Sequence, residues 1–348
     1  MIASSAARRS ITLLASSALF VSVALAFFAL NGAAPWDVFV AMVQGAYGDG
    51  FAIGISLVKA TPILLCALAV ALPARMGLIT VGAEGQLYFG ALVGTAAVLH
   101  FINASAWLLL PAMLLAALLG GAAWGAIPGF LRARLDVNET IVTILLNYVA
   151  VHLVEYAVYG PWKDPGNLGW PATIAFPEAA KFPEFTLAGV TVHWEFVLAC
   201  LLAVAMHMLI SKSRWGLSLT ILRSNRRAAM VAGLSYAKNA VVVMALSGML
   251  AALAGIVQTA DVQGRLQPDI SVGYGLSGFL VAWLAGQNFL WIVPLSLLMG
   301  GLTASADSLQ LFAQLPFAST VVLQGLLFGS VLALNGFMRG GFLRGRGR

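Results

Sequence analysis

Long apolar runs, separated by short polar segments, occupy almost the entire sequence. A helix that crosses a bilayer needs about 20 mostly apolar residues, and runs of that length recur from one end of the chain to the other. Reading hydropathy against turn-forming and helix-breaking residues predicts about 10 transmembrane helices in an all-α integral membrane protein. The predicted spans are residues 11–31, 54–73, 77–100, 107–131, 139–159, 194–211, 237–259, 272–287, 290–308 and 318–337.

Composition agrees with this pattern and excludes other classes of protein. Of the 348 residues, 61% are hydrophobic and 9% are charged, whereas soluble domains carry roughly 25% charged residues. No segment is left over for a separate soluble domain, so residues 1–348 are predicted to form a single transmembrane domain. The net charge of +6 lies in short loops, which argues against a nucleic-acid partner. Cys66 and Cys200 fall in apolar runs and predict neither a disulfide nor a metal site.

The first apolar run, residues 11–31, follows a basic start and could belong to a cleaved signal peptide. A signal core is about 7–15 residues long, and this run is longer. We therefore predict an uncleaved first span.

The basic residues predict the orientation. With the N-terminus inside, fifteen of the nineteen Lys and Arg residues fall on inner segments, and only Lys163, Lys181 and Arg265 fall on outer loops. The positive-inside rule then predicts that both termini are cytoplasmic (N-in/C-in). The longest external loop, 160–193, is rich in Pro, Gly and aromatic residues. It predicts an irregular cap, which either meets an external partner or is a plain connector.

The longest cytoplasmic connection, residues 212–239, predicts a short helix on the inner face. Ser224 and Asn225 are good N-cap residues, Ala228 and Ala229 favour helix, and Gly233 is a good stop. The alternative is a basic membrane anchor in which the helix is incidental.

Glu84 is an unusual residue for its position. If the span begins near Gly77, Glu84 lies roughly 10 Å inside it, and an ionisable residue at that depth marks a functional site. Gly82 and Gly85 permit a broken or closely packed helix there. The alternative is that Glu84 bonds to neighbouring backbone and holds two helices together.

Two further polar stretches interrupt the apolar pattern. Asn138 is predicted to be an N-cap and Glu139 a first-turn acid. Asn147, about 13.5 Å further along the same helix, either bonds a neutral polar ligand or bridges helices. Gly286, Gln287 and Asn288 predict a tight cytoplasmic turn.

Motifs for catalysis are absent from the sequence. It contains no G-x-x-x-x-G-K-[ST] phosphate loop, no nucleophile elbow and no paired His-Cys cluster, and His100, His152, His193 and His207 are scattered. We predict no catalytic residue, no metal site, no cofactor and no enzymatic activity for this chain.

Three blocks, in the right order, resemble one family. "GLITVGAEGQ" resembles the signature "G-L-F-N-I-G-A-E-G-Q" of permeases of ATP-binding-cassette (ABC) importers for simple sugars, nucleosides and branched-chain amino acids, with Ile79 and Thr80 in place of Phe and Asn. "NETIVTILLNYVA" resembles the nucleoside and purine branch. "SNRRAAMVAGLSYAK" is similar to the cytoplasmic "G-x-N-P-x-A-A-x-x-x-G-I" segment, with Ser224 in place of Gly. A weaker match near Gln287 extends the resemblance to residues 55–335.

The resemblance implies one transmembrane permease subunit of an importer in the bacterial cytoplasmic (inner) membrane. Its partners would be cytoplasmic ABC ATPases that hydrolyse the ATP, a second permease (the same chain or a paralogue), an external solute-binding protein and the lipid bilayer. The solute would be a nucleoside or purine, with ribose-like sugars and then branched-chain amino acids as alternatives. The residues implied for the translocation pathway or a helix break are Gly82, Glu84, Gly85, Gln86 and Asn147, and those for ATPase coupling, in segment 212–239, are Asn225, Arg226, Arg227, Ala228, Ala229 and Gly233.

Two functions of other classes compete with this one. An ion-coupled secondary transporter would use Glu84 as its titrating group and would need no ATPase. A membrane scaffold would assemble with partners without moving any solute.

Overall fold

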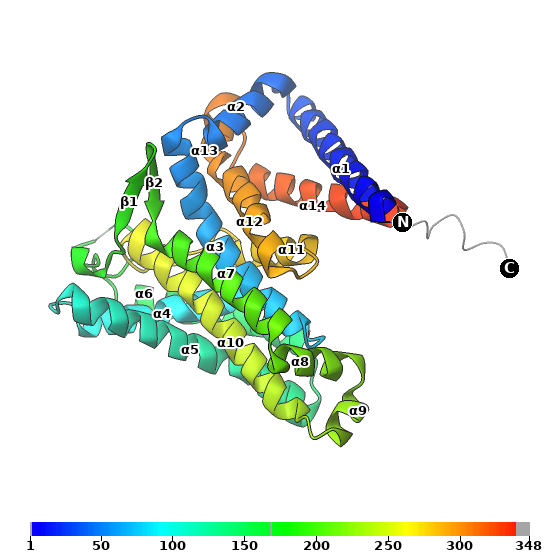
Figure 1. The fold of residues 1–348 in the computed structure, drawn as a ribbon. Helices are drawn as coiled ribbons and strands as arrows, with labels where there is room; N and C mark the ends of the chain where they lie inside the picture. The colour runs from blue at the N-terminus through cyan, green and yellow to red at the C-terminus, as the bar shows by residue number, and fades with distance from the viewer. Residues whose placement is uncertain (1, 168, 339–348) are drawn as a thin grey trace. The chain divides into compact units, whose positions relative to one another are not determined.

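The computed structural model describes residues 2–167 and 169–338, and the side chains within 15–333 of that range. The chain is helical through most of this length (Figure 1). It divides into two compact units, one formed by residues 1–56 and 299–348 and the other by residues 57–298. The smaller unit contains α1 (Ile2–Leu30), α2 (Pro35–Tyr47), α13 (Ala306–Ala313) and α14 (Ala318–Met338).

The larger unit carries all the candidate site residues. Helices α3 (Gly50–Ala74) and α12 (Phe289–Ala304) continue from the smaller unit into it. Its other elements are α4 (Ala83–His100), α5 (Ala106–Leu135), α6 (Glu139–Tyr159), η1 (Glu178–Ala180), β1 (Glu184–Leu187), β2 (Val190–His193), α7 (Trp194–Lys212), α8 (Arg214–Ser224), α9 (Arg226–Val231), α10 (Tyr236–Val257), the π-helical η2 (Gln258–Gln263) and α11 (Tyr274–Leu284).

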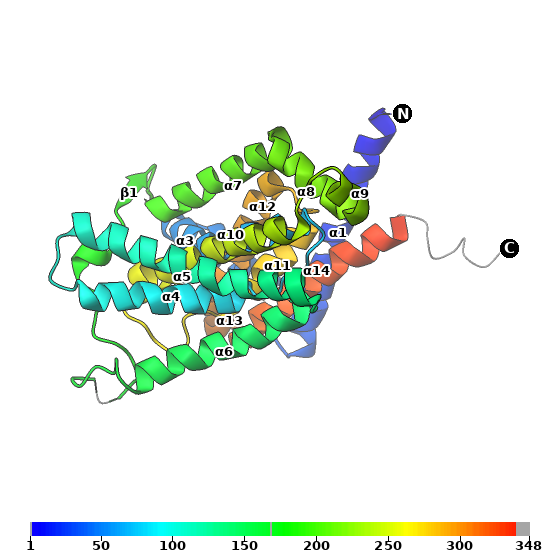
Figure 2. The same ribbon diagram turned by 90° about the horizontal axis from the view of Figure 1, so that it is seen from below.

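Helix α10 lies at the centre of the larger unit, packed along α5 and α4 (Figures 1 and 2). Small residues allow this approach: a Cβ at Gly248 of α10 would collide with the Gly121 carbonyl of α5. Close contact through small residues is typical of helix pairs in membranes, where packing rather than hydrophobic exclusion drives association. The outward faces of α5, α6 and α7 carry exposed apolar side chains such as Leu119, Leu145 and Leu201, as expected of surfaces that contact lipid.

Six helices of the described residues are long and apolar enough to cross a membrane, or seven if the bent pair of residues 15–30 and 35–47 forms one span. Several predicted spans agree closely with helices: 139–159 has the bounds of α6, and 194–211 and 237–259 differ from α7 and α10 by a residue or two. The predicted count of about ten is not reached by this criterion. Helix α4, in the predicted span 77–100, does not meet it, and the predicted spans 272–287 and 318–337 contribute only the shorter apolar stretches 274–284 and, within the described side chains, 318–333.

The predicted span 77–100 is wrong at its start. Helix α3 ends at Ala74, Gly77 adopts a left-handed φ of +82°, and α4 begins only at Ala83. Segment 160–193, predicted to be an irregular external cap, contains an antiparallel hairpin in which Glu184 pairs with His193. The hairpin was missed because its strands have only four residues each, too few to give a clear alternating pattern.

Candidate functional site

A non-helical segment, residues 75–82, separates α3 from α4. Its peptide groups need hydrogen-bond partners, because unpaired backbone groups are costly away from water. Helix α6 supplies them through four polar residues that recur on one face of the helix: Glu139, Thr140, Thr143 and Asn147.

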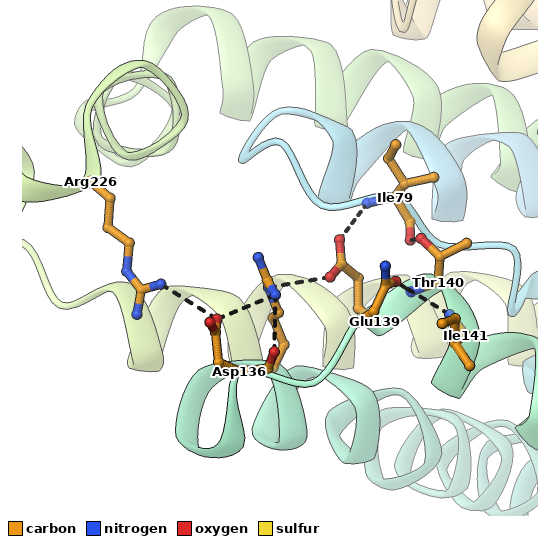
Figure 3. A network of polar contacts seen from close by, with 8 residues as sticks. Ile79, Asp136, Glu139, Thr140, Ile141 and Arg226 are labelled. Atoms are coloured by element: carbon orange, nitrogen blue, oxygen red, sulfur yellow. Dashed lines mark hydrogen bonds and ion pairs between the residues drawn. The ribbon is translucent and has the colours of Figure 1, made fainter.

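The first two residues of this polar face bind Ile79 from both sides (Figure 3). The Ile79 amide donates to Glu139 Oε1 at 3.1 Å, and Thr140 Oγ1 donates to the Ile79 carbonyl at 2.9 Å. Asn138 caps α6 as predicted, since its side chain accepts from the amides of Thr140 and Ile141. The start of α6 is thereby fixed against the non-helical segment.

The next two residues continue the contact toward α4. The Val81 amide donates to Thr143 Oγ1 at 3.3 Å. Asn147 Nδ2 donates to the Val81 carbonyl at 2.9 Å, while Asn147 Oδ1 accepts from the Gly85 amide at 2.9 Å. The side-chain amide of Asn147 therefore bonds to backbone groups through both its nitrogen and its oxygen.

Gly82 and Gly85 are the residues that allow α6 to come this close. A Cβ at Gly85 would lie 2.7 Å from Asn147 Cα, and a Cβ at Gly82 would lie 2.8 Å from Thr143 Cβ. Real Cβ atoms do not approach so closely, so either substitution would force the two segments apart.

Glu84 lies in the first turn of α4, at the start of the helix instead of two turns inside it. Its Oε2 accepts a hydrogen bond of 2.6 Å from the amide of Gly275, in the first turn of α11. A carboxylate is favoured at a helix N-terminus by the unpaired amides and the helix dipole. Here one carboxylate lies at the N-termini of two helices.

Gln86 lies on the side of α4 that faces α3 and α10, not on the side that contacts α6. It is 1% exposed, and Ser247 Oγ of α10 lies 3.5 Å from Gln86 Oε1 while donating to the Ala69 carbonyl of α3 at 2.7 Å. The structure brings Gly82, Glu84, Gly85 and Asn147 into one cluster, and Gln86 lies between α3, α4 and α10.

A short helix is present where segment 212–239 predicted one. Asn225, not Ser224, is its N-cap and accepts from the Ala228 amide at 3.0 Å, and Gly233 follows with a φ of +81°. Ala229 faces inward, whereas Arg226, Arg227 and Ala228 are exposed. Beside them Val231 is 91% exposed. Helix α8, which precedes it, was not predicted, since its residues lack a clear apolar period.

Ion pairs connect this short helix to the non-helical segment (Figure 3). Arg226 Nη1 is 3.9 Å from Asp136 Oδ1, Arg132 is 3.3 Å from both Asp136 and Glu139, and Glu139 holds the Ile79 amide. The guanidinium of Arg226 also lies 3.8 Å from the centre of the Tyr236 ring. Sequence reasoning missed Arg132 and Asp136, because both looked like ordinary residues at a span end.

The predicted turn at 286–288 is confirmed. Gly286 and Gln287 have φ of +58° and +62°, and the Gln287 carbonyl accepts from Arg75 Nη2 at 2.8 Å. Burial, together with the charge of Arg223, lowers the pKa of Arg75. The ends of α3, α8 and α11 thus lie together, since Arg223 also donates to the Ala74 carbonyl at 3.3 Å.

Comparison with known proteins matches one family over most of the chain. The model of the family described as "Branched-chain amino acid transport system / permease component" matches residues 52–332. The glucose ABC transporter permease protein TsgB13 of Haloferax volcanii is 34% identical, over 92% of this chain and 88% of its own length.

Two nucleoside permeases are also similar. The guanosine ABC transporter permease protein NupP of Bacillus subtilis is 33% identical, over 79% of each chain. The nucleoside ABC transporter permease protein NupB of Lactococcus lactis is 26% identical, over 76% of this chain and 74% of its own. Among solved structures, an inward-facing ABC transporter chain covers 89% of this chain at a TM-score of 0.47 and 17% identity.

Proposed function

Because this chain belongs to the family of branched-chain amino acid transport system permease components, we propose that it is the membrane-spanning permease subunit of an ABC importer for nucleosides or purines. The observation that carries the proposal is its similarity to a guanosine permease and a glucose permease, at 33% and 34% identity. Sugars are the second candidate solute, favoured by the glucose relative; branched-chain amino acids rank third. ATP hydrolysis belongs to separate cytoplasmic ATPase subunits, a second permease subunit completes the membrane part, and an external solute-binding protein delivers the solute.

The topology that we propose has both termini inside a bacterial inner membrane and ten membrane-embedded helices. It counts α1, α3, α4, α5, α6, α7, α10, α11, α12 and α14. The contacts of Arg75 with Gln287, of Arg223 with Ala74 and of Arg226 with Asp136 support it, because the topology places all six residues on the inner side.

On this topology, α4 and α11 form a pair of broken spans of opposite direction. Residues 76–82 enter the membrane from the cytoplasmic side, and α4 then continues to the outer side. Residues 264–273 enter the membrane from the outer side, and α11 then continues to the cytoplasmic turn. The two N-termini meet at Glu84 and Gly275. Paired half-helices are the feature around which many transporters build a site near the midplane.

We propose that Glu84 and Asn147 fix the positions of the two half-helices relative to each other and to α6, and do not bind the solute directly. Their polar atoms bond to backbone groups of α4, α11 and the non-helical segment. Gly82 and Gly85 permit the close approach, and Gln86 packs the far side of α4 against α10. Rigid half-helices held in this way would border the pathway, and their relative movement would open or close it.

We assign α9 to coupling with the ATPase. Asn225 and Gly233 define its two ends, Ala229 anchors it, and Arg226, Arg227 and Ala228 present an exposed face. The chain of ion pairs through Asp136, Arg132 and Glu139 would connect movement of α9 to residue 79 and so to the broken spans.

Uptake into proteoliposomes tests the function. The chain is reconstituted with its ATPase, a second permease where needed and the solute-binding protein, and import of radiolabelled guanosine is measured with and without ATP. We expect import only with all components and ATP, and competition by other nucleosides but not by glucose. Gradient-driven import by this chain alone would support the secondary transporter, and ATP-dependent import of glucose instead would change the solute.

A further inference from the structure

Three ionisable side chains from separate elements converge where α7 begins and α10 ends. His193 is the last residue of β2, Glu195 lies in the first turn of α7, and Asp261 belongs to η2. His193 Nδ1 is 3.3 Å from Glu195 Oε1 and 4.0 Å from Asp261 Oδ2. One nitrogen or oxygen of each residue lies within 4.8 Å of the other two. None of the three is among the residues assigned to the translocation pathway or to ATPase coupling.

Burial makes this cluster unusual. The side chains of Glu195 and Asp261 are 2% and 4% exposed. His193 Nδ1, Glu195 Oε2 and Asp261 Oδ2 are buried and have no hydrogen-bond partner within the described part of the chain. Buried polar atoms without hydrogen bonds are costly, and a cation held by His193 Nδ1, Asp261 Oδ2 and the Glu195 carboxylate would compensate them together.

The spacing suits a transition-metal ion. Tetrahedral Zn²⁺ binds nitrogen and oxygen at about 2.0–2.2 Å, which separates its ligand atoms by about 3.4 Å. The His193–Glu195 distance of 3.3 Å fits directly, and the 4.0 Å to Asp261 needs a small side-chain rotation. One imidazole with two carboxylates is a ligand set that divalent transition metals share, and it leaves a position open to water.

Neighbouring groups orient two of the three ligands. The second oxygen of Asp261 accepts from the Phe182 amide at 2.8 Å, and His193 Nε2 lies 3.5 Å from Glu184 Oε2. A carboxylate beside the outer nitrogen of a metal-binding histidine is a common arrangement that fixes the ring.

A cavity leads to the cluster. Its volume is about 620 Å³, and it is bordered by Glu178, Lys181, Phe182, Glu184, His193 and Asp261. The opening gives a hydrated ion a route to His193 and Asp261. At the entrance Lys181 pairs with Glu178 at 2.7 Å, and Glu184 adds a further carboxylate beside His193.

We propose that His193, Glu195 and Asp261 form a binding site for a divalent transition-metal cation, with Zn²⁺ as the ion that this ligand set suits best. The bound ion ties the β1–β2 hairpin and the start of α7 to the end of α10. It thereby fixes the segment 160–193, which the proposed topology places on the outer face. The site needs no solute and no ATPase.

Calorimetric titration of the metal-stripped full chain in detergent with ZnCl₂ tests the proposal. We expect one saturable site per chain and a higher melting temperature when Zn²⁺ is present. His193→Gln and Asp261→Asn should each weaken binding at least tenfold, in line with the usual loss when metal-site residues are altered. His152→Gln is the matched control, because His152 also lies beside a carboxylate, Glu155 at 2.7 Å, but is exposed.

Three results would overturn the site. They are the absence of saturable one-to-one binding, a wild-type affinity in folded His193→Gln and Asp261→Asn chains, or equal weakening by His152→Gln. Glu195→Gln replaces either variant that fails to fold. A proton shared between the two carboxyl groups would give a melting temperature that responds to pH and not to Zn²⁺, and that result also contradicts the proposal.

Discussion

At the scale of single residues, polar side chains in the apolar core form hydrogen bonds with backbone groups. Asn147 contacts two peptide groups of the segment around α4, and Glu84 contacts the first turn of α11. A hydrogen bond to a charged group contributes about 1.5–3 kcal/mol, and leaving a buried donor unpaired costs a similar amount. These residues therefore stabilise a non-helical backbone that the apolar surroundings would otherwise disfavour.

The variant Glu84→Gln distinguishes two roles of Glu84: accepting a hydrogen bond from the Gly275 amide, or gaining and losing a proton during transport. The Gln side-chain oxygen can still accept from the Gly275 amide, so we expect ATP-dependent uptake within about threefold of wild type, since a neutral acceptor is weaker by roughly half. Glu84→Ala removes the acceptor and should reduce uptake by about tenfold or more, corresponding to a loss of about 1.4 kcal/mol or more. Proteoliposome uptake measures both. Loss of all transport in a folded Glu84→Gln chain would instead indicate that Glu84 carries protons.

Gly85→Ala tests the close approach of α4 and α6. The added Cβ would lie 2.7 Å from Asn147 Cα, and because backbone cannot rotate away we expect destabilisation of about 1–3 kcal/mol and reduced uptake. Gly325→Ala on α14 is the control, since its Cβ meets nothing within 4 Å and alanine favours helix by about 0.5–1 kcal/mol. Thermal unfolding in detergent measures both. Equal melting temperatures for the two variants would contradict the packing argument.

At the scale of elements, the sequence predicted long helices well and broken ones poorly. The bounds of α6 follow from Asn138, whose capping geometry is local and visible in the sequence. The break at 77–82 was placed inside a helix because its residues are as apolar as a span, and because its hydrogen-bond partners belong to α6, sixty or more positions away. Likewise His193 and Asp261 look scattered until the fold brings β2 and η2 together.

Val231→Glu tests the coupling role of α9. Val231 is 91% exposed beside the basic face of this helix, where a new carboxylate would disturb an apolar contact with the ATPase without affecting the core. We expect the ATPase to co-purify at least tenfold less and uptake to fall in proportion. Leu187→Glu on β1, also an exposed apolar residue at 65%, is the control and should keep ATPase binding. Retained ATPase binding in Val231→Glu would show that the contact lies elsewhere.

At the scale of the whole molecule, the proposed orientation predicts which ends of the helices face each compartment. Arg132, Arg223 and Arg226 would lie on the cytoplasmic side, and the hairpin and the His193 cluster on the outer side. In this orientation the ion-pair chain through Asp136 would connect the proposed ATPase contact with the broken spans. An inverted orientation would remove the basis for both the coupling role of α9 and the outer placement of the metal site.

Labelling of single cysteines tests this orientation. Cys66 is buried and Cys200 partly buried, so both are first replaced by Ala, and cysteine is then introduced at Leu187 or Val231, which are both well exposed. A membrane-impermeant maleimide added to intact spheroplasts should label the residue-187 variant and not the residue-231 variant, because only the hairpin lies outside. Inside-out vesicles should give the opposite result. The reverse labelling would place α9 outside, where it could not meet a cytoplasmic ATPase. Labelling of both variants from the same side would show that α7, the one helix proposed to cross the membrane between them, does not cross it.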